Sequence, residues 1–119
     1  MKDFPDFMKN NKNRVPVKDQ NTQDVVGYFF EGADGTQMAF WTCHSDKLSL
    51  THSHEFDEYL VCVYGEYTVI VGDKETVLKP GDEFVIPKHT PHCSKRIVGT
   101  RTIHAFGGKR IQRTEKKSL

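Results

Sequence analysis

Apolar and polar positions alternate along most of the chain in short runs, and turn residues separate the runs. Turn signals recur about every eight to twelve residues without a long stretch of helical period, which is typical of an all-β sandwich or barrel. β-Branched and aromatic residues dominate the apolar runs, as expected for strands. The pattern predicts about nine short strands, at Val25–Phe30, Gln37–Cys43, Leu48–Thr51, Tyr59–Tyr64, Tyr67–Val71, Glu75–Lys79, Glu83–Ile86, His92–Arg96 and Arg101–Phe106.

The ends of the chain differ from its middle. Residues 1–24 are polar and irregular, so we expect an N-terminal arm. Residues 109–119 form a basic tail that is poor in apolar residues, and we expect at least part of it to be disordered. One all-β domain over residues 25–108 remains, which suits a chain of 119 residues. Its first two strands form a hairpin, because Asp34-Gly35 between them is a strong turn signal.

Composition indicates the cellular compartment of the protein and the kinds of molecule that it binds. The chain has 17 Lys and Arg against 16 Asp and Glu, so its charge gives no reason to expect nucleic acid as a partner. No apolar run approaches the roughly 20 residues of a membrane span, and the N-terminus lacks the apolar segment of a signal peptide. Three isolated cysteines argue against a disulfide framework and a thiolate zinc site. We therefore expect a cytoplasmic protein that binds a small molecule.

Histidine and carboxylate side chains gather in one segment of the chain. His52 and His54 are two residues apart, so on a strand both imidazoles point to the same face. Glu58 has the same parity, and His92 begins a later strand that antiparallel folding could return to the same place. Such a set without thiolates favours one divalent transition metal per chain, either Mn, Fe, Co, Ni or Zn. Spacing does not support a helical metalloprotease site, because HExxH is absent.

The run His52-x-His54-x3-Glu58-x6-Gly65 resembles the first motif of the cupins. Gly81-x5-Pro87-x-His89-x2-His92 is similar to the second motif, with His89 where the family usually has glycine. The resemblance implies a cupin-type jelly-roll β-barrel whose metal ligands are His52, His54, Glu58 and His92. Because cupins commonly pair through edge strands, it also implies a homodimer.

For several other polar residues the sequence leaves more than one role open. His89 is either a turn residue at the barrel mouth, a fifth metal ligand or a proton donor near the metal. His104 is either a structural histidine or, if its strand faces inward, a further ligand or a general acid/base. Both are candidate catalytic residues. Lys95, Arg96 and Arg101 could steer an anionic substrate, although strand-end cations and basic tails more often remain solvated.

Four protein ligands on an octahedral ion leave two positions for a small molecule that binds through two oxygens. We therefore expect a metal-dependent isomerase, lyase or dioxygenase acting on a small oxygen-rich metabolite such as a sugar acid. The alternative is a non-catalytic module that binds or senses a small ligand at the same metal site.

Overall fold

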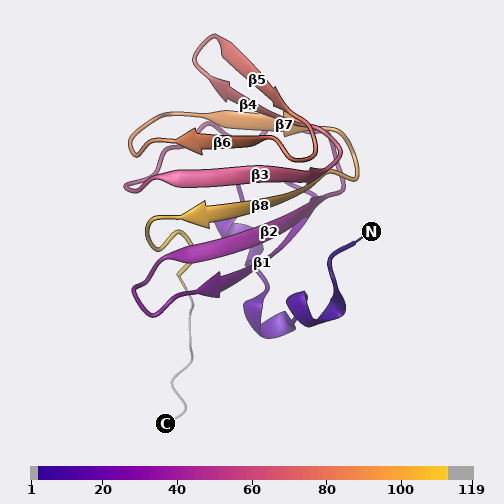
Figure 1. The fold of residues 1–119 in the computed structure, drawn as a ribbon, viewed down its shortest axis with the longest axis vertical. Coiled ribbons are helices and arrows are strands. Elements are labelled where there is room, and N and C mark those ends of the chain that lie inside the picture. The colour runs from indigo at the N-terminus through magenta and orange to yellow at the C-terminus, as the bar shows by residue number, and fades with distance from the viewer. Residues whose placement is uncertain (1–2, 113–119) are drawn as a thin grey trace.

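The computed structural model describes residues 3–112 and consists of two antiparallel sheets (Figure 1). The larger sheet has the strand order β1-β2-β8-β3-β6, and the smaller sheet has the order β5-β4-β7. The strands are β1 (Val25–Glu31), β2 (Gln37–Cys43), β3 (Glu58–Tyr64), β4 (Tyr67–Val71), β5 (Lys74–Leu78), β6 (Glu83–Ile86), β7 (Cys93–Arg96) and β8 (Arg101–Phe106). This arrangement confirms the predicted all-β jelly roll, although hydrogen bonds do not close the two sheets of the described chain into one ring.

The predicted hairpin is present, and one predicted strand is not. β1 pairs with β2 from Val25↔Cys43 to Glu31↔Gln37, and Gly35 takes the positive φ of 88° in the turn. The prediction of a strand at Leu48–Thr51 was wrong. This segment crosses between the sheets and makes only single backbone hydrogen bonds to other elements, such as Ser49 N to the carbonyl of Ser94 at 2.9 Å. Its leucines point to solvent, so their alternation marks no buried face.

The N-terminal segment folds onto the larger sheet. It contains three single-turn 3-10 helices, η1 (Asp6–Met8), η2 (Asn11–Asn13) and η3 (Val17–Asp19). Val15 is buried and its amide donates to the carbonyl of Gly27 at 2.8 Å, so the segment covers the free edge of β1. Within residues 3–112 no helix is long and apolar enough to cross a membrane.

Two hydrophobic clusters form the core. The first joins the N-terminal segment, β1, β2 and β8, and it includes Trp41, Phe106 and Ile111. The second lies around β3, β4, β5 and β6, with Leu60 among its most buried residues. A cavity between the clusters takes lining residues from both. The polar residues that cluster in the sequence meet on the wall of this cavity.

The chain beyond β8 remains packed on the protein as far as the structure describes it. Ile111 is fully buried, and its backbone exchanges two hydrogen bonds of 2.8 Å with the side chain of Gln37. The first residues of the predicted basic tail are therefore anchored to β2, which the sequence did not lead us to expect. Residues 113–119, the rest of that predicted tail, lie outside the described residues.

Candidate metal centre

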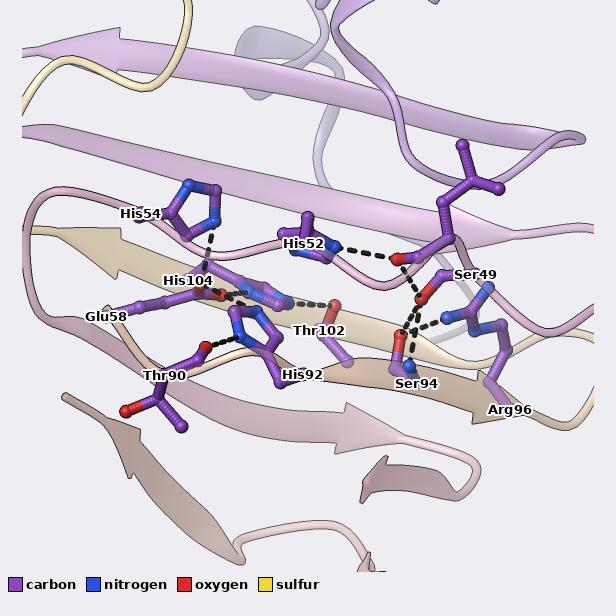
Figure 2. A network of polar contacts seen from close by, with 11 residues as sticks. Ser49, His52, His54, Glu58, Thr90, His92, Ser94, Arg96, Thr102 and His104 are labelled. Carbon is purple, nitrogen blue, oxygen red and sulfur yellow. Dashed lines mark hydrogen bonds and ion pairs between the residues drawn. The ribbon is translucent and has the colours of Figure 1, made fainter. Parts of the chain in front are cut away.

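A backbone bridge brings the two histidine segments together. His52 and His92 form an isolated antiparallel pair in which each amide donates to the other's carbonyl at 2.9 Å. Their ring centroids lie 4.2 Å apart, and the ring of His54 lies 5.0 Å from that of His52. One ligating nitrogen from each of the three histidines falls within 4.8 Å of the others (Figure 2). The two distant motifs thus meet at one point.

Glu58, the first residue of β3, adds a carboxylate to this cluster. Its Oε1 atom lies 3.4 Å from His54 Nε2 and 3.7 Å from His92 Nε2. Within the part of the chain that the structure describes, Glu58 Oε1 and His54 Nε2 are buried and have no hydrogen-bond partner. Burial of unpartnered polar atoms costs free energy, and a cation bound between them would remove that cost.

Backbone carbonyls orient two of the histidine rings. His52 Nδ1 lies 2.8 Å from the carbonyl of Leu50, and His92 Nδ1 lies 2.8 Å from the carbonyl of Thr90. A carbonyl only accepts hydrogen bonds, so each Nδ1 carries the proton and donates. The Nε2 atom of each neutral ring therefore keeps its lone pair, which is the state that binds a metal ion.

His104 holds the other oxygen of the Glu58 carboxylate. Its Nδ1 donates to Glu58 Oε2 at 2.6 Å, and its Nε2 lies 3.0 Å from the hydroxyl of Thr102. Both nitrogens of this buried ring are thus engaged by protein atoms. A hydrogen bond of this kind fixes the orientation of a ligating carboxylate.

The environment sets the charges of the cluster. Burial alone raises the pKa of Glu58, but the hydrogen bond from His104 and the electrostatic influence of nearby His54 lower it more, and the net result is a pKa well below the usual range. Burial lowers the pKa of His52 to about 4, and the hydrogen bond to the Leu50 carbonyl offsets this only in part. At neutral pH the carboxylate is therefore charged and this imidazole is neutral. These are the protonation states that divalent metals require.

The donor set fits a divalent transition metal. His52, His54 and His92 offer imidazole nitrogens and Glu58 offers one carboxylate oxygen, while the cluster contains no thiolate. Mixed nitrogen and oxygen donors suit Mn, Fe, Co, Ni or Zn better than Cu(I), Mg or Ca. The unpartnered atoms of Glu58 and His54 are consistent with this fit, because a bound cation would satisfy both of them.

The cluster faces a cavity that contains about 600 Å³ of space free of protein atoms, part of it open to solvent. Tyr67 and Cys43 line this cavity beside the cluster. Burial raises the pKa of Tyr67 to about 12, against a smaller lowering by Arg96, and burial raises the pKa of Cys43 to about 11. Both groups therefore stay protonated at neutral pH and can donate but not accept a proton.

The structure places the sequence candidates as follows. His52, His54, Glu58 and His92 come together, and His104 lies on the inward face of β8 with Thr102 and Phe106 (Figure 2).

His89 lies elsewhere. It takes a φ of 64°, so the histidine adopts the left-handed backbone that its position in the turn requires. Its side chain is largely exposed and lies 3.7 Å from the carboxylate of Glu55. His89 is not among the residues that line the cavity, so the geometry gives no support to a catalytic role for it.

Sequence reasoning did not place Arg96 and Arg110 in the cavity wall, and it named Arg96 only as a residue that could steer an anionic substrate. The parity of β7 could have identified Arg96, because His92, Ser94 and Arg96 alternate on one face and all three are buried. For Arg110 the only signal was Ile111, an isolated apolar residue in a basic segment.

Comparisons with known proteins agree with this geometry. The structure is similar to KdgF from Halomonas sp., with 21% identity, a TM-score of 0.66 and coverage of 78% of this chain and 84% of that one. It is also similar to an RmlC-like cupin from Shewanella frigidimarina, with 18% identity, a TM-score of 0.69 and coverage of 87% and 86%. The polyketide cyclase RemF from Streptomyces resistomycificus gives 17% identity, a TM-score of 0.66 and coverage of 78% and 71%. No curated protein matches the sequence.

At these identities the structural matches show a shared fold and not a shared activity. The family model for the cupin domain matches residues 40–106, which is more than half of the chain and contains all four candidate metal ligands. The chain therefore belongs to the cupin family.

Proposed function

We propose that the protein is a divalent-metal-dependent enzyme, an isomerase, lyase or dioxygenase, that acts on a small oxygen-rich metabolite such as a sugar acid. The observation that carries the proposal is the unpartnered pair of buried atoms, Glu58 Oε1 and His54 Nε2, in a histidine cluster that opens onto a cavity. The polyketide cyclase among the structural neighbours supports it, because it shows that this fold can carry catalysis.

Each group in the site has a distinct part in this proposal. His52, His54, Glu58 and His92 would hold the ion, which when bound supplies a Lewis acid that polarises a carbonyl and stabilises developing enolate charge. His104 positions Glu58 through the 2.6 Å hydrogen bond. Tyr67 remains protonated and can donate a hydrogen bond to a substrate oxygen as negative charge develops there.

One observation favours the alternative, a module that binds a ligand without turnover. Both nitrogens of His104 are engaged, and burial keeps Tyr67 and Cys43 protonated. These groups do not offer a free general base to the substrate. If the protein is an enzyme, the metal-bound groups must therefore provide most of the activation.

The test is a reaction screen on protein loaded separately with Mn, Fe, Co, Ni or Zn. Aldoses, ketoses and 2-keto acids are incubated in D2O, and deuterium entry beside the carbonyl is followed by NMR while an electrode follows O2 uptake. Metal-dependent exchange supports an isomerase or lyase, and metal-dependent O2 uptake supports a dioxygenase. Saturable binding without either signal supports the binding module and contradicts the enzyme.

We further propose that the protein is a cytoplasmic homodimer. Cys43, Cys62 and Cys93 are free thiols, which suits a reducing compartment. Exposed apolar side chains such as Val77 and Val85 lie on β5 and β6, strands at the edges of the two sheets, and dimer contacts would cover such edges.

A further inference from the structure

Arg96 is the last residue of β7 and lines the same cavity as His52, Glu58 and His92. Only 6% of the residue is exposed, and its guanidinium donates to Ser94 Oγ (Figure 2). A second hydrogen bond, to the carbonyl of Lys47, also fixes it. Its centre also lies 5.4 Å from the centroid of the Tyr67 ring. The Nε atom is buried and has no hydrogen-bond partner. One N–H of a rigidly held cation is thus left without an acceptor.

Arg110 lines the cavity from the segment that follows β8. The hydrogen bonds between Ile111 and Gln37 anchor this segment, and the Arg110 guanidinium lies 5.2 Å from the ring of Trp41 and 5.3 Å from that of Phe106. Its Nη1 atom is buried without a hydrogen-bond partner. No described residue forms an ion pair or a hydrogen bond with Arg110. The aromatic rings hold the cation in place without satisfying its donors.

Neither arginine has a carboxylate partner within 4 Å among residues 3–112, although a buried guanidinium normally needs one. Glu58 and Asp19 act on Arg110 only at longer range, and burial still lowers the pKa of Arg110. The positive charge of Arg110 contributes to lowering the pKa of His52, because the two groups line the same cavity. Two cations with free donors therefore line a cavity in which Glu58, already engaged by histidines, is the only acidic residue that the described part of the chain contributes.

We propose that Arg110 and Arg96 form an anion subsite, which binds a carboxylate of the substrate while the substrate's reacting oxygens face His52, His54 and His92. The inference rests on the proposed function in that it places a substrate in this cavity, and it narrows that substrate to an organic anion. Arg110 makes the main contact because its donors are uncommitted, and Arg96 adds one N–H from a fixed position. Guanidinium groups suit this task because their donors match the geometry of a carboxylate.

Trp41 is the only tryptophan in the chain and lies against Arg110, so its fluorescence reports on this subsite. The titrants are glucose, glucuronate and glucose 6-phosphate, which differ only at carbon 6. Each is added to metal-loaded and to EDTA-treated wild type, Arg110→Met and Lys109→Met. Lys109→Met is the matched control, because it removes a cation from the neighbouring residue, which is exposed.

We expect glucuronate to bind wild type at least about tenfold more tightly than glucose, and Arg110→Met to lose this preference, since one charged hydrogen bond is worth about a factor of ten or more. Lys109→Met should keep it. The melting temperature of metal-free Arg110→Met should be unchanged or higher, because the variant removes an unpaired buried charge. Tighter binding of glucose 6-phosphate than of glucuronate would identify the anion as a phosphate and overturn the carboxylate assignment.

The subsite is refuted if neither anion binds more tightly than glucose, or if Arg110→Met binds glucuronate as wild type does. A melting temperature more than about 5 °C lower for Arg110→Met would mark the residue as structural and would also overturn the inference. The EDTA-treated samples separate the two proposals. If the protein binds no metal but binds anions through Arg110, the subsite is supported and the metal enzyme is contradicted. If the protein binds metal but shows no preference for anions, the subsite is contradicted and the metal site stands.

Discussion

Replacement of Glu58 by glutamine should remove most of the stabilisation that a bound metal ion gives the protein. The variant keeps the size of the side chain and an oxygen that can accept from His104 Nδ1. Its amide nitrogen can then face His54 Nε2 and His92 Nε2, which lie 3.4 and 3.7 Å from Oε1 in the wild type. In the metal-free protein the substitution thus supplies donors to nitrogens that lack them. For a metal ion, however, it removes the only anionic ligand of the cluster.

The size of the effect follows from linkage. Metal at one hundred times its dissociation constant stabilises the wild type by about 2.7 kcal/mol, which raises the melting temperature of a domain of this size by roughly 8–16 °C. Loss of a partner that only orients a ligand weakens metal affinity about 10–100-fold, so we use about a hundredfold for loss of the ligand itself. At the same metal concentration the variant then gains only about 0.4 kcal/mol, or roughly 1–3 °C.

The assay is differential scanning fluorimetry with and without added Zn, Ni or Co. Glu55→Gln is the matched control, because Glu55 is three residues away with an 89% exposed side chain and should leave the full metal response in place. Each shift is measured from the metal-free form of the same protein, because Glu58→Gln also loses the negative charge that the hydrogen bond from His104 stabilises. If Glu58→Gln keeps the wild-type shift on metal addition, Glu58 is not a ligand and the proposed cluster is wrong.

Three further outcomes follow from the same structure. His104→Gln should weaken metal affinity about 10–100-fold through the lost orientation of Glu58, whereas His89→Asn should leave affinity unchanged in a metal titration, since His89 is exposed and asparagine tolerates its φ of 64°. The free energy of unfolding of the metal-free protein should fall as pH drops from about 6.5 to 4, because the pKa of His52 is about 4 in the folded state and near 6.5 in the unfolded chain. The lowered pKa of Glu58 adds a further loss of stability below about 4.5. A free energy of unfolding from urea denaturation that stays constant over this pH range would contradict both effects. Light scattering should give twice the chain mass of 13.7 kDa, and a monomer at high micromolar concentration would exclude the homodimer.

The sequence predicted the parts of the fold that depend on local pattern. β2, β4, β6 and β8 have the bounds expected from alternation and turn residues, and Asp34-Gly35 marks the first hairpin. Parity predicted that His52 and His54 point to the same side, because side chains two residues apart share a face in extended chain. The two motifs that resemble those of the cupins predicted that His92 joins them.

Long-range packing decides what the sequence could not predict. The parity of His104 did not say which face of β8 is inward, and only the sheet order answers that. Arg110 follows two glycines in a basic run, so its position in the cavity depends on the Ile111–Gln37 contact across the chain. At Leu48–Thr51 the two leucines are exposed, and the backbone makes only single hydrogen bonds, one of them from Ser49 to Ser94 of β7. The apolar alternation there marks neither a buried face nor a strand ladder, which is why local pattern failed.

The central claim is that His52, His54, Glu58 and His92 bind one metal ion, and elemental analysis tests it most directly. Wild type and His92→Ala are purified without chelators or added metal, and metal per chain is measured by inductively coupled plasma mass spectrometry. We predict about one equivalent of a divalent transition metal per wild-type chain and loss of most of it in His92→Ala, with the β-sheet circular dichroism spectrum retained. Wild-type protein that contains no metal and takes up none on reconstitution, or a His92→Ala variant that keeps the full equivalent, would contradict the claim.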